Sequence, residues 1–451
     1  MTYVPHTERE TRDMLAAVGV SRMEDLFDDV PAALRFPALE LPAPSSEPEI
    51  TAEMQGLAGC NFAVEPSHSF LGAGTYHHFR PATVGYVLRR GEFYTSYTQY
   101  QPEASQGMLQ ALFEYQSMIS RLTAMEVSNA SHYDGATALA EAVLLALNVA
   151  QGKRSKIILS PAVHPQYRAV VKTYLRGTHA AAITGDEDGR CDLGQLVGRL
   201  DGETAALVIQ NPDFFGQCEP VDGLADAVHR AGALLIVATD PIALGLLRPP
   251  GAYGADVVVA DGQPLGIAPS FGGPHLGIFA SRMEYARRLS GHLVGETVDA
   301  EGRRGYVLTL ATREQHIRRA KATSNICTNS ALCAVAAAAY LATMGKQGLR
   351  RVAELCFHKS HYAAAEIGRL EGFAVNPQAP SRAFFKEFVV RLPRPPAEVN
   401  KMLRERHGII GGYDLGGDYP HLAGHMLLAV TEVNTRAAID RLVGALREIA
   451  A

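Results

Sequence analysis

Six short apolar runs recur between Lys156 and Ala280, and they limit the fold more than any other feature of the sequence. Helical or loop segments separate most of them. Continuous apolar strands that alternate with helices are typical of a mostly parallel sheet covered by helices on both faces. In such sheets ligands bind at the carboxyl ends of the strands, here the loops after Gln210, Ala238 and Ala260. The runs are KIILS (156–160), AAAIT (180–184), ALVIQ (206–210), LLIVA (234–238), DVVVA (256–260) and LGIFA (276–280).

Three domains are predicted around this sheet. Residues 1–65 hold an amphipathic helix and then an extended arm over Pro37–Ile50, a segment with four prolines that we expect to wrap a neighbour or a second domain. Residues 66–330 form a large α/β domain that includes amphipathic and buried helices over 108–122 and 134–150. Residues 331–451 form a smaller α+β domain with helices and the strand-like runs FFKEFVVRL (384–392) and HMLLAVTE (425–432).

Composition and charge exclude several classes of function. The 451 residues carry a net charge of −5 and no long basic run, so we expect no nucleic-acid partner. The longest apolar stretch, Ala331–Met344, is too short to span a membrane. Because the first residues are polar, we expect no signal peptide. Six cysteines without a C-x-x-C pair indicate free thiols in a reducing cytoplasm. The pair His77 and His78 is not taken as a metal site, because adjacent side chains rarely converge on one ion.

Two aspartates occupy positions typical of a cofactor site. Asp240 ends the run LLIVATD, where a carboxylate can pair with a pyridinium nitrogen, or simply cap the next turn. Asp134 precedes a buried helix in SNASHYDGATA, where the helix N-terminus can hold a phosphate. The alternative for Asp134 is an ordinary N-cap.

Two further stretches offer groups for binding anions. Tyr97 and Tyr100 lie in SYTQYQPEASQG (96–107), where they can stack on a ring, donate to an anion or pack in an interface. Arg313 and Lys321 lie in the basic stretch TREQHIRRAKATSNICT (312–328). Arginine suits bidentate binding of carboxylates, although a solvated helix face is the common alternative.

Several long motifs resemble the family of the glycine cleavage system P-protein, glycine decarboxylase. They extend from about residue 70 to 330, and the N-terminal arm is similar as well. The resemblance implies a fold-type I pyridoxal phosphate enzyme. The motifs are FLGAGTYHHFRPATV, EFYTSYTQYQPEASQGMLQALFEYQ, NASHYDGATALAEA, ADGQPLGIAPSFGGPHLGIFA and LTLATREQHIRRAKATSNICTNSAL.

In this family the enzyme often consists of two homologous chains, and the sequence resembles the alpha-type chain (N-terminal half) that lacks the cofactor lysine. The lysine-bearing chain has a His-Lys-Thr loop where this sequence has Gln263 and Pro264. Proline has no amine, and no lysine lies between Lys172 and Lys321. We therefore expect no primary amine near Pro264, and a chain that is inactive alone.

The resemblance also implies the reaction and the partners. The lysine-bearing subunit 2 binds pyridoxal phosphate, which accepts electrons when glycine loses CO2. The aminomethyl group then passes to the lipoyl arm of the H-protein, an oxidoreductase reaction of glycine catabolism. We expect Tyr97, Tyr100 and Arg313 to reach the partner's site in a heterodimer, while Asp134, Asp240, Gln263 and Pro264 mark a vestigial cofactor site. The alternatives are a structural or docking subunit, and an independent pyridoxal enzyme that uses Lys321.

Overall fold

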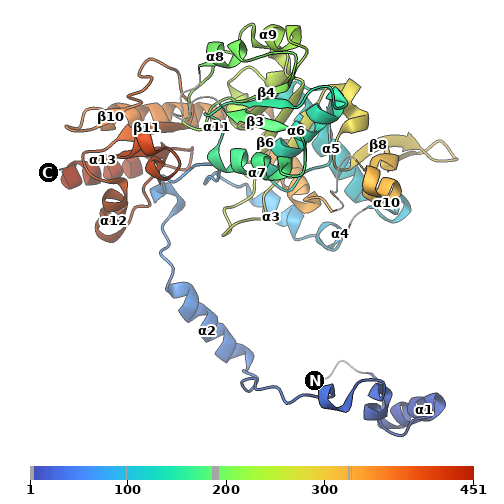
Figure 1. The fold of residues 1–451 in the computed structure, drawn as a ribbon. Helices are drawn as coiled ribbons and strands as arrows, with labels where there is room; N and C mark the ends of the chain where they lie inside the picture. Colours follow the sequence, from blue (N-terminus) through green and yellow to red (C-terminus); the bar gives the residue numbers. More distant parts are fainter. Residues whose placement is uncertain (1–4, 98, 185–191, 323–325, 327, 451) are drawn as a thin grey trace. The chain divides into compact units, whose positions relative to one another are not determined.

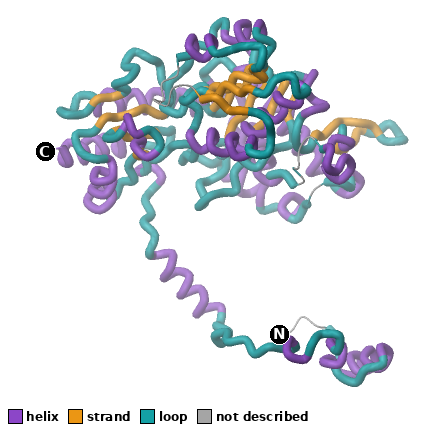
Figure 2. The backbone as a smooth tube through the Cα atoms, in the orientation of Figure 1, coloured by secondary structure: helices purple, strands orange, loops and turns teal. Residues whose placement is uncertain are grey.

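The chain divides into two compact units, Met1–Ala63 and Val64–Ala451, which we describe separately. The computed structural model describes residues 5–97, 99–184, 192–322, 326 and 328–450. Figures 1 and 2 show the chain by sequence position and by secondary structure. Within the described residues, every helix is too short or too polar to cross a membrane.

The N-terminal unit contains two α-helices and no buried residue among residues 5–63. Helix α1 (Glu8–Val18) begins at a capping box formed by Thr7 and Glu10. Helix α2 (Glu47–Gly59) begins at a second capping box, so the predicted extended arm is wrong over its last residues, 47–50. The physical reason is that Ser46 caps the helix and Pro48 is tolerated in its first turn.

A seven-stranded sheet forms the centre of the larger unit, in the order β1-β7-β6-β5-β4-β2-β3. The pairs from β6 to β3 are parallel, whereas β7 runs antiparallel to β6 and to β1. The predicted mostly parallel sheet is confirmed, and each of the six apolar runs forms one of its strands. These are β2 (Lys156–Leu159), β3 (Ala181–Thr184), β4 (Thr204–Gln210), β5 (Leu234–Thr239), β6 (Val257–Asp261) and β7 (Gly277–Ser281), to which β1 (Val127–Ser128) adds a short edge.

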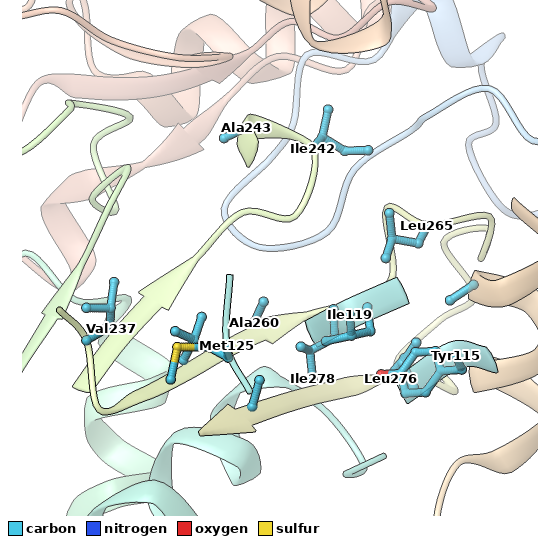
Figure 3. Close-up of a cluster of buried hydrophobic side chains, with 14 of the residues drawn as sticks. Tyr115, Ile119, Met125, Val237, Ile242, Ala243, Ala260, Leu265, Leu276 and Ile278 are labelled. Atoms are coloured by element: carbon cyan, nitrogen blue, oxygen red, sulfur yellow. The ribbon is translucent and has the colours of Figure 1, made fainter. Parts of the chain in front are cut away.

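Helices cover both faces of this sheet, and alternate residues of each strand face opposite cores. Val257 and Val259 of β6 pack in the core with α6 and α7, while Val258 and Ala260 pack in the core with α5 and α11. Figure 3 shows part of the core on the α5 and α11 side, with Tyr115 of α5, Ala260 of β6 and Ile278 of β7 among the labelled residues. The helices in this part of the larger unit are α3 (Ala82–Leu88), α4 (Gly91–Tyr94), α5 (Gln106–Thr123), α6 (Gly135–Ala150), α7 (Pro165–Leu175), α8 (Leu193–Gly198), α9 (Leu224–Arg230) and α10 (Gln315–Arg318). The same part contains the hairpin of β8 (Leu293–Val298) and β9 (Arg304–Thr309).

An antiparallel sheet in the order β10-β11-β13-β12 follows in the C-terminal part of the same unit. Helix α11 (Ala331–Ile367) links the two parts. Its residues between 334 and 356 pack in the core with α5, and those between 363 and 367 pack in the core of the antiparallel sheet. The helix is interrupted at Gly345, whose φ is 60°. The predicted boundary at residue 330 stays a prediction. The elements are β10 (Ala374–Val375), β11 (Glu387–Arg391), β12 (Tyr413–Asp414), β13 (His425–Ala429), α12 (Pro396–His407) and α13 (Arg436–Ala450).

Candidate functional site

Polar side chains gather where β4, β5 and β6 end. Gln210, Asp240 and Asp261 lie at or just past the ends of these strands, as the parallel topology predicts. They border a cavity of about 40 Å³, here called the strand-end cavity, together with Tyr76 and Pro264. The chain therefore keeps a polar pocket at the edge where this class of sheet binds ligands.

The carboxylate of Asp240 is paired with a buried lysine from a distant part of the chain. Lys386 is 1% exposed and its ammonium forms an ion pair with Asp240. The same ammonium lies 3.2 Å from the centre of the Tyr76 ring, a cation–π contact. Burial raises the pKa of Asp240, but Lys386 and then His78 lower it, so the pKa lies below the ordinary value. The expectation of no primary amine in this neighbourhood is therefore wrong.

Lys386 reaches the pocket because the segment before β11 folds against the loop after β4. Its φ of 63° is a left-handed conformation that costs a non-glycine residue roughly 1–2 kcal/mol. Phe385 donates its backbone N–H to the carbonyl of Gly216, 2.8 Å away. The neighbouring Glu387 accepts hydrogen bonds from the Ala73 N–H at 2.7 Å and the Tyr76 hydroxyl at 2.8 Å. Burial raises the pKa of Glu387 despite the adjacent ammonium.

The N-terminus of α6 is occupied by two carboxylates. Asp134 accepts the Thr137 N–H at 2.8 Å, so the N-cap alternative describes its contacts. Asp261 accepts the Gly135 N–H at 3.1 Å and the Nδ1–H of His275 at 2.9 Å. The Asp261 carboxylate raises the pKa of His275 above its usual value. These groups line a second cavity of about 610 Å³, here called the helix-end cavity.

The loop after β6 is locked by Gln263. Its side-chain amide donates to the carbonyls of Tyr76 at 2.9 Å and Ile267 at 2.6 Å, and its oxygen accepts the Tyr76 N–H at 2.9 Å. Gln263 is fully buried, so every group it offers is used within the chain. Pro264, the next residue, borders the strand-end cavity.

His164 lies between the two cavities and is neutral. Its Nε2–H donates to the Ala73 carbonyl at 2.8 Å, while Nδ1 accepts the Gln166 N–H at 3.1 Å. These partners fix one tautomer, because a carbonyl only accepts and a backbone N–H only donates. Burial lowers the pKa of His164. Its ring stacks on Tyr167 with centroids 4.8 Å apart.

The residues present do not fit pyridoxal phosphate, the cofactor that the resemblance implies for the pair of chains. The strand-end cavity of about 40 Å³ is far smaller than the roughly 300–1,000 Å³ of small-molecule sites. Asp240 already holds a cation, and the helix-end cavity presents carboxylates where a phosphate would bind. We therefore place no cofactor in this chain.

The residues predicted to reach a partner lie elsewhere in the larger unit. Tyr97 is 73% exposed, with its hydroxyl 3.3 Å from Thr328 Oγ1. Tyr100 packs edge-on against His316, with ring centroids 5.3 Å apart, and lines an open cavity of about 640 Å³ with that histidine and Arg319. We call this the tyrosine cavity.

Arg313 is buried and engaged by the backbone. Its guanidinium donates to the carbonyls of Leu310 at 3.1 Å, Gly291 at 3.1 Å and Leu289. Burial lowers the pKa of Arg313. Arg319, by contrast, is exposed. The sequence-predicted role of Arg313 at a substrate stays a prediction, and the contacts show what the side chain does within this chain.

A second buried polar cluster adjoins the pocket. His78 Nδ1 lies 2.7 Å from Glu432 Oε2, and Cys356 donates its thiol to the same oxygen at 3.4 Å. Phe79 donates its N–H to the other carboxylate oxygen at 2.6 Å. Both carboxylate oxygens of Glu432 thus have partners within the chain. In the described part of the chain, Cys60, Cys218, Cys333 and Cys356 are free thiols.

Sequence reasoning missed Lys386, Tyr76, Glu387 and Asp261. The one local signal was a lysine–glutamate pair inside the apolar run FFKEFVVRL, since charged residues are almost never fully buried unless paired. The pairing itself had no signal, because the partners come from separate sheets. Of the predicted positions, Asp240 and Pro264 share one cavity, Asp134 lines the neighbouring one, and Gln263 is packed beneath them.

Comparison with known proteins places these features in a family. Residues 1–446 match the model of the family described as glycine cleavage system P-protein. A probable glycine dehydrogenase (decarboxylating) subunit 1 of Thermomicrobium roseum is 54% identical over 453 residues, which covers 100% of both chains. A crystal structure of glycine decarboxylase (P-protein) of the glycine cleavage system, in inhibitor-bound form, is 46% identical with a TM-score of 0.91 and covers 100% of both chains.

A more distant neighbour shows the fold alone. Sphingosine-1-phosphate lyase of Burkholderia pseudomallei has a TM-score of 0.67 at 16% identity, over 93% of this chain and 94% of that one. The predicted fold class, an α/β fold of the type I pyridoxal phosphate enzymes, is confirmed.

Proposed function

Because the chain belongs to the family of the glycine cleavage system P-protein, we propose that it is the lysine-lacking subunit of a two-subunit glycine decarboxylase. The homologous subunit 2 supplies pyridoxal phosphate on its own lysine, and that group accepts the electrons released when glycine loses CO2. The aminomethyl group passes to the lipoyl arm of the H-protein. The observation that carries the proposal is Pro264, which borders the strand-end cavity. The family resemblance implies that the lysine of the homologous chain occupies this position.

Lys386 does not replace the missing lysine. In this fold an aspartate after a strand pairs with the ring nitrogen, whereas the aldehyde lies on the opposite side of the same ring. The ammonium of Lys386 is paired with Asp240, at the end where the ring nitrogen would lie. An amine held there cannot form an imine with an aldehyde on the far side of a ring that also contacts Asp240. The chain alone is therefore expected to be inactive.

The tyrosine cavity is the part of this chain that we propose completes the partner's site. Tyr97 and Tyr100 are exposed aromatic side chains, which are favoured in interfaces. We keep the proposed role of Arg313 in binding the glycine carboxylate. In that role its guanidinium exchanges backbone carbonyls for the carboxylate. Arg319 is a second candidate for the same role, because its side chain is exposed and lines the cavity already.

Mixing the two chains tests the proposed function. Glycine-dependent exchange of labelled CO2 is measured for this chain, for subunit 2 and for the mixture, each with lipoylated H-protein. We expect exchange only in the mixture, with a maximum at equal amounts of the two chains. Full exchange by this chain alone, or by subunit 2 alone, would contradict the proposal.

Single substitutions in the assembled pair test the residues. Tyr97→Phe, Tyr100→Phe and Arg319→Lys are compared with Arg313→Lys for assembly, glycine KM and kcat. We expect a cation that binds the glycine carboxylate to raise KM by about tenfold or more when replaced, an effect of about 1.4 kcal/mol. Unchanged KM and kcat remove a residue from the site.

The contacts of Arg313 favour a second candidate function, a structural or docking subunit. In that case no side chain of this chain lies near the partner's ring, and Arg313 only holds the backbone of residues 289–310. Its substitution would then lower the stability of the isolated chain but leave the KM of the assembled pair unchanged. Tyr97→Ala that leaves the pair assembled but inactive would instead favour the shared site.

An independent pyridoxal enzyme remains the third alternative. Lys321 is exposed and ends the short 3-10 helix Arg319–Lys321. Borohydride reduction of the chain with pyridoxal phosphate, followed by peptide mapping, tests both Lys321 and Lys386. We expect no stoichiometric label at either lysine. The cytoplasm stays the proposed location, in keeping with the free thiols in the described part of the chain.

A further inference from the structure

The pocket at the strand ends contains a counterpart for each charged group of the cofactor it does not fit. We propose that this chain's own side chains take the place of pyridoxal phosphate, with Lys386 at the ring-nitrogen end, two carboxylates at the phosphate end and Gln263 at the aldehyde end. All of these groups belong to this chain, so the proposal does not depend on the proposed function.

At the ring-nitrogen end, Lys386 supplies the positive charge that a protonated pyridine would supply. Its ammonium is paired with Asp240 and lies 3.2 Å from the centre of the Tyr76 ring. The side chain is 1% exposed. A buried cation and a buried carboxylate compensate one another, whereas either alone would be strongly unfavourable.

At the phosphate end, Asp134 and Asp261 supply the negative charge. Asp134 accepts the Thr137 N–H, and Asp261 accepts the Gly135 N–H, so two of the free amide groups at the start of α6 are used. A phosphate brought to this helix end would lose those donors and would meet two like charges. The Gly135 position is also tight, because a Cβ there would lie 2.2 Å from the Tyr167 hydroxyl.

At the aldehyde end, Gln263 ties the loop after β6 to the segment that carries Tyr76. Its three hydrogen bonds to the backbone of Tyr76 and Ile267 draw these segments together. The strand-end cavity that remains is about 40 Å³. Each end of the former site therefore meets a group of this chain. The space at the strand ends is reduced to the small strand-end cavity, and the larger helix-end cavity opens onto two carboxylates that have taken the helix amides a phosphate would need.

Equilibrium dialysis of the full chain tests whether the pocket is closed. The probe is pyridoxine 5′-phosphate, which keeps the ring and the phosphate but lacks the aldehyde, so surface lysines cannot react with it. Subunit 2 serves as the positive control. We expect no retention of the probe by this chain at concentrations that load the control. Stoichiometric retention would overturn the proposal.

A double-mutant cycle tests whether Lys386 and Asp240 compensate one another. Lys386→Met, Asp240→Asn and the double variant are compared by the equilibrium constant of unfolding in denaturant. If the two side chains did not interact, the factors by which the single variants raise the unfolding equilibrium constant would multiply in the double variant. We expect the equilibrium constant of the double variant to be at least tenfold smaller than that product. Arg350→Met with Glu354→Gln is the matched control on the surface, where the pair is 61% and 28% exposed, and we expect less than threefold coupling.

The single variant Asp240→Asn keeps the test decisive if Lys386→Met does not fold. It leaves the shape of the pocket nearly unchanged but leaves the ammonium of Lys386 without a carboxylate. We expect it to unfold at lower denaturant concentration than the wild type. A variant as stable as the wild type, or a cycle in which the single losses simply add, would overturn the proposal.

Discussion

At the scale of single residues, Gly216 lets the two sheets of the larger unit approach one another. Its φ is 81°, and a Cβ at this position would lie 2.0 Å from the Glu387 carbonyl oxygen. Gly223 has a similar φ of 74°, but a Cβ there would meet no atom within 4 Å. A substitution at Gly223 therefore tests backbone strain alone, whereas a substitution at Gly216 tests the same strain together with a steric clash.

We expect Gly223→Ala to lower the free energy of unfolding by roughly 1–2 kcal/mol, the cost of a left-handed alanine. Gly216→Ala should cost about 2–5 kcal/mol, because overpacking against the backbone of residue 387 adds to that strain. Chemical denaturation of the two variants measures the difference. Equal losses would show that the segment carrying Lys386 is not held against this loop.

Two histidines give stability a dependence on pH of opposite sign. Asp261 raises the pKa of His275, so its contribution is present below about pH 6.5 and is lost as pH rises through the folded-state pKa. Burial lowers the pKa of His132 to about 3, so its contribution is present above about pH 6.5 and is lost as pH falls towards 3.

The stability that each histidine contributes is the unfolding free energy of the wild type minus that of the variant. This difference should change with rising pH in opposite directions for the two histidines. For His275→Asn it should shrink as pH rises above about 6.5. For His132→Asn it should grow between about pH 3 and 6.5, by on the order of 5 kcal/mol, because about 3.5 units of pKa separate the two states. Parallel curves for the two variants would contradict the assigned protonation states. Denaturant titrations across this pH range provide the measurement.

At the scale of elements, the sequence was most informative where periodicity is long and local. Strands β2 to β7 follow continuous apolar runs, and α5 and α6 follow helical spacing, so their positions were predictable. The two-residue strands β1, β10 and β12 were missed, because two residues carry no periodicity. The hairpin β8–β9 was missed as well; β8 becomes exposed towards its end and carries no continuous apolar run.

The candidate site divides in the same way. Asp240 and Asp134 were identifiable, because each follows or precedes an element with a clear pattern. The ion pair of Lys386 with Asp240 was not, since it depends on how a strand of the second sheet docks against the first. The three carbonyl contacts of Arg313 were equally invisible, because local sequence shows charge but not the backbone that a folded loop presents.

The start of α6 offers a prediction at this scale. Asp134 caps the helix through the Thr137 N–H. We expect Asp134→Ala to lower the free energy of unfolding by about 1 kcal/mol, while Asp134→Ser, which keeps an oxygen acceptor, loses much less. Thermal or chemical denaturation distinguishes them. Equal losses for alanine and serine would mean that the carboxylate acts by its charge near His275 and not as a cap.

At the scale of the whole molecule, the N-terminal unit builds no core of its own. No residue among 5–63 is buried. Even apolar side chains are exposed, namely Leu39 at 72%, Leu41 at 74% and Phe36 at 60%. A segment that buries so little cannot offset the entropy lost when it becomes ordered. Apolar side chains displayed in this way are typical of a binding surface. On the proposed function, we propose that the lysine-bearing subunit binds this surface.

Deleting residues 1–63 should therefore weaken binding to the lysine-bearing subunit at least tenfold. A gentler test replaces Leu39 and Leu41 with serine, matched by Val298→Ser, which alters a side chain 64% exposed on β8. Titration calorimetry should show weaker binding for the leucine variant and unchanged binding for Val298→Ser.

Proteolysis within the extended segment 37–46 should be fast for the free chain and slow for the pair, because ordering by a partner removes the backbone from the protease. Equal affinity after deletion, together with equal cleavage in the pair, would show that the arm serves some other surface.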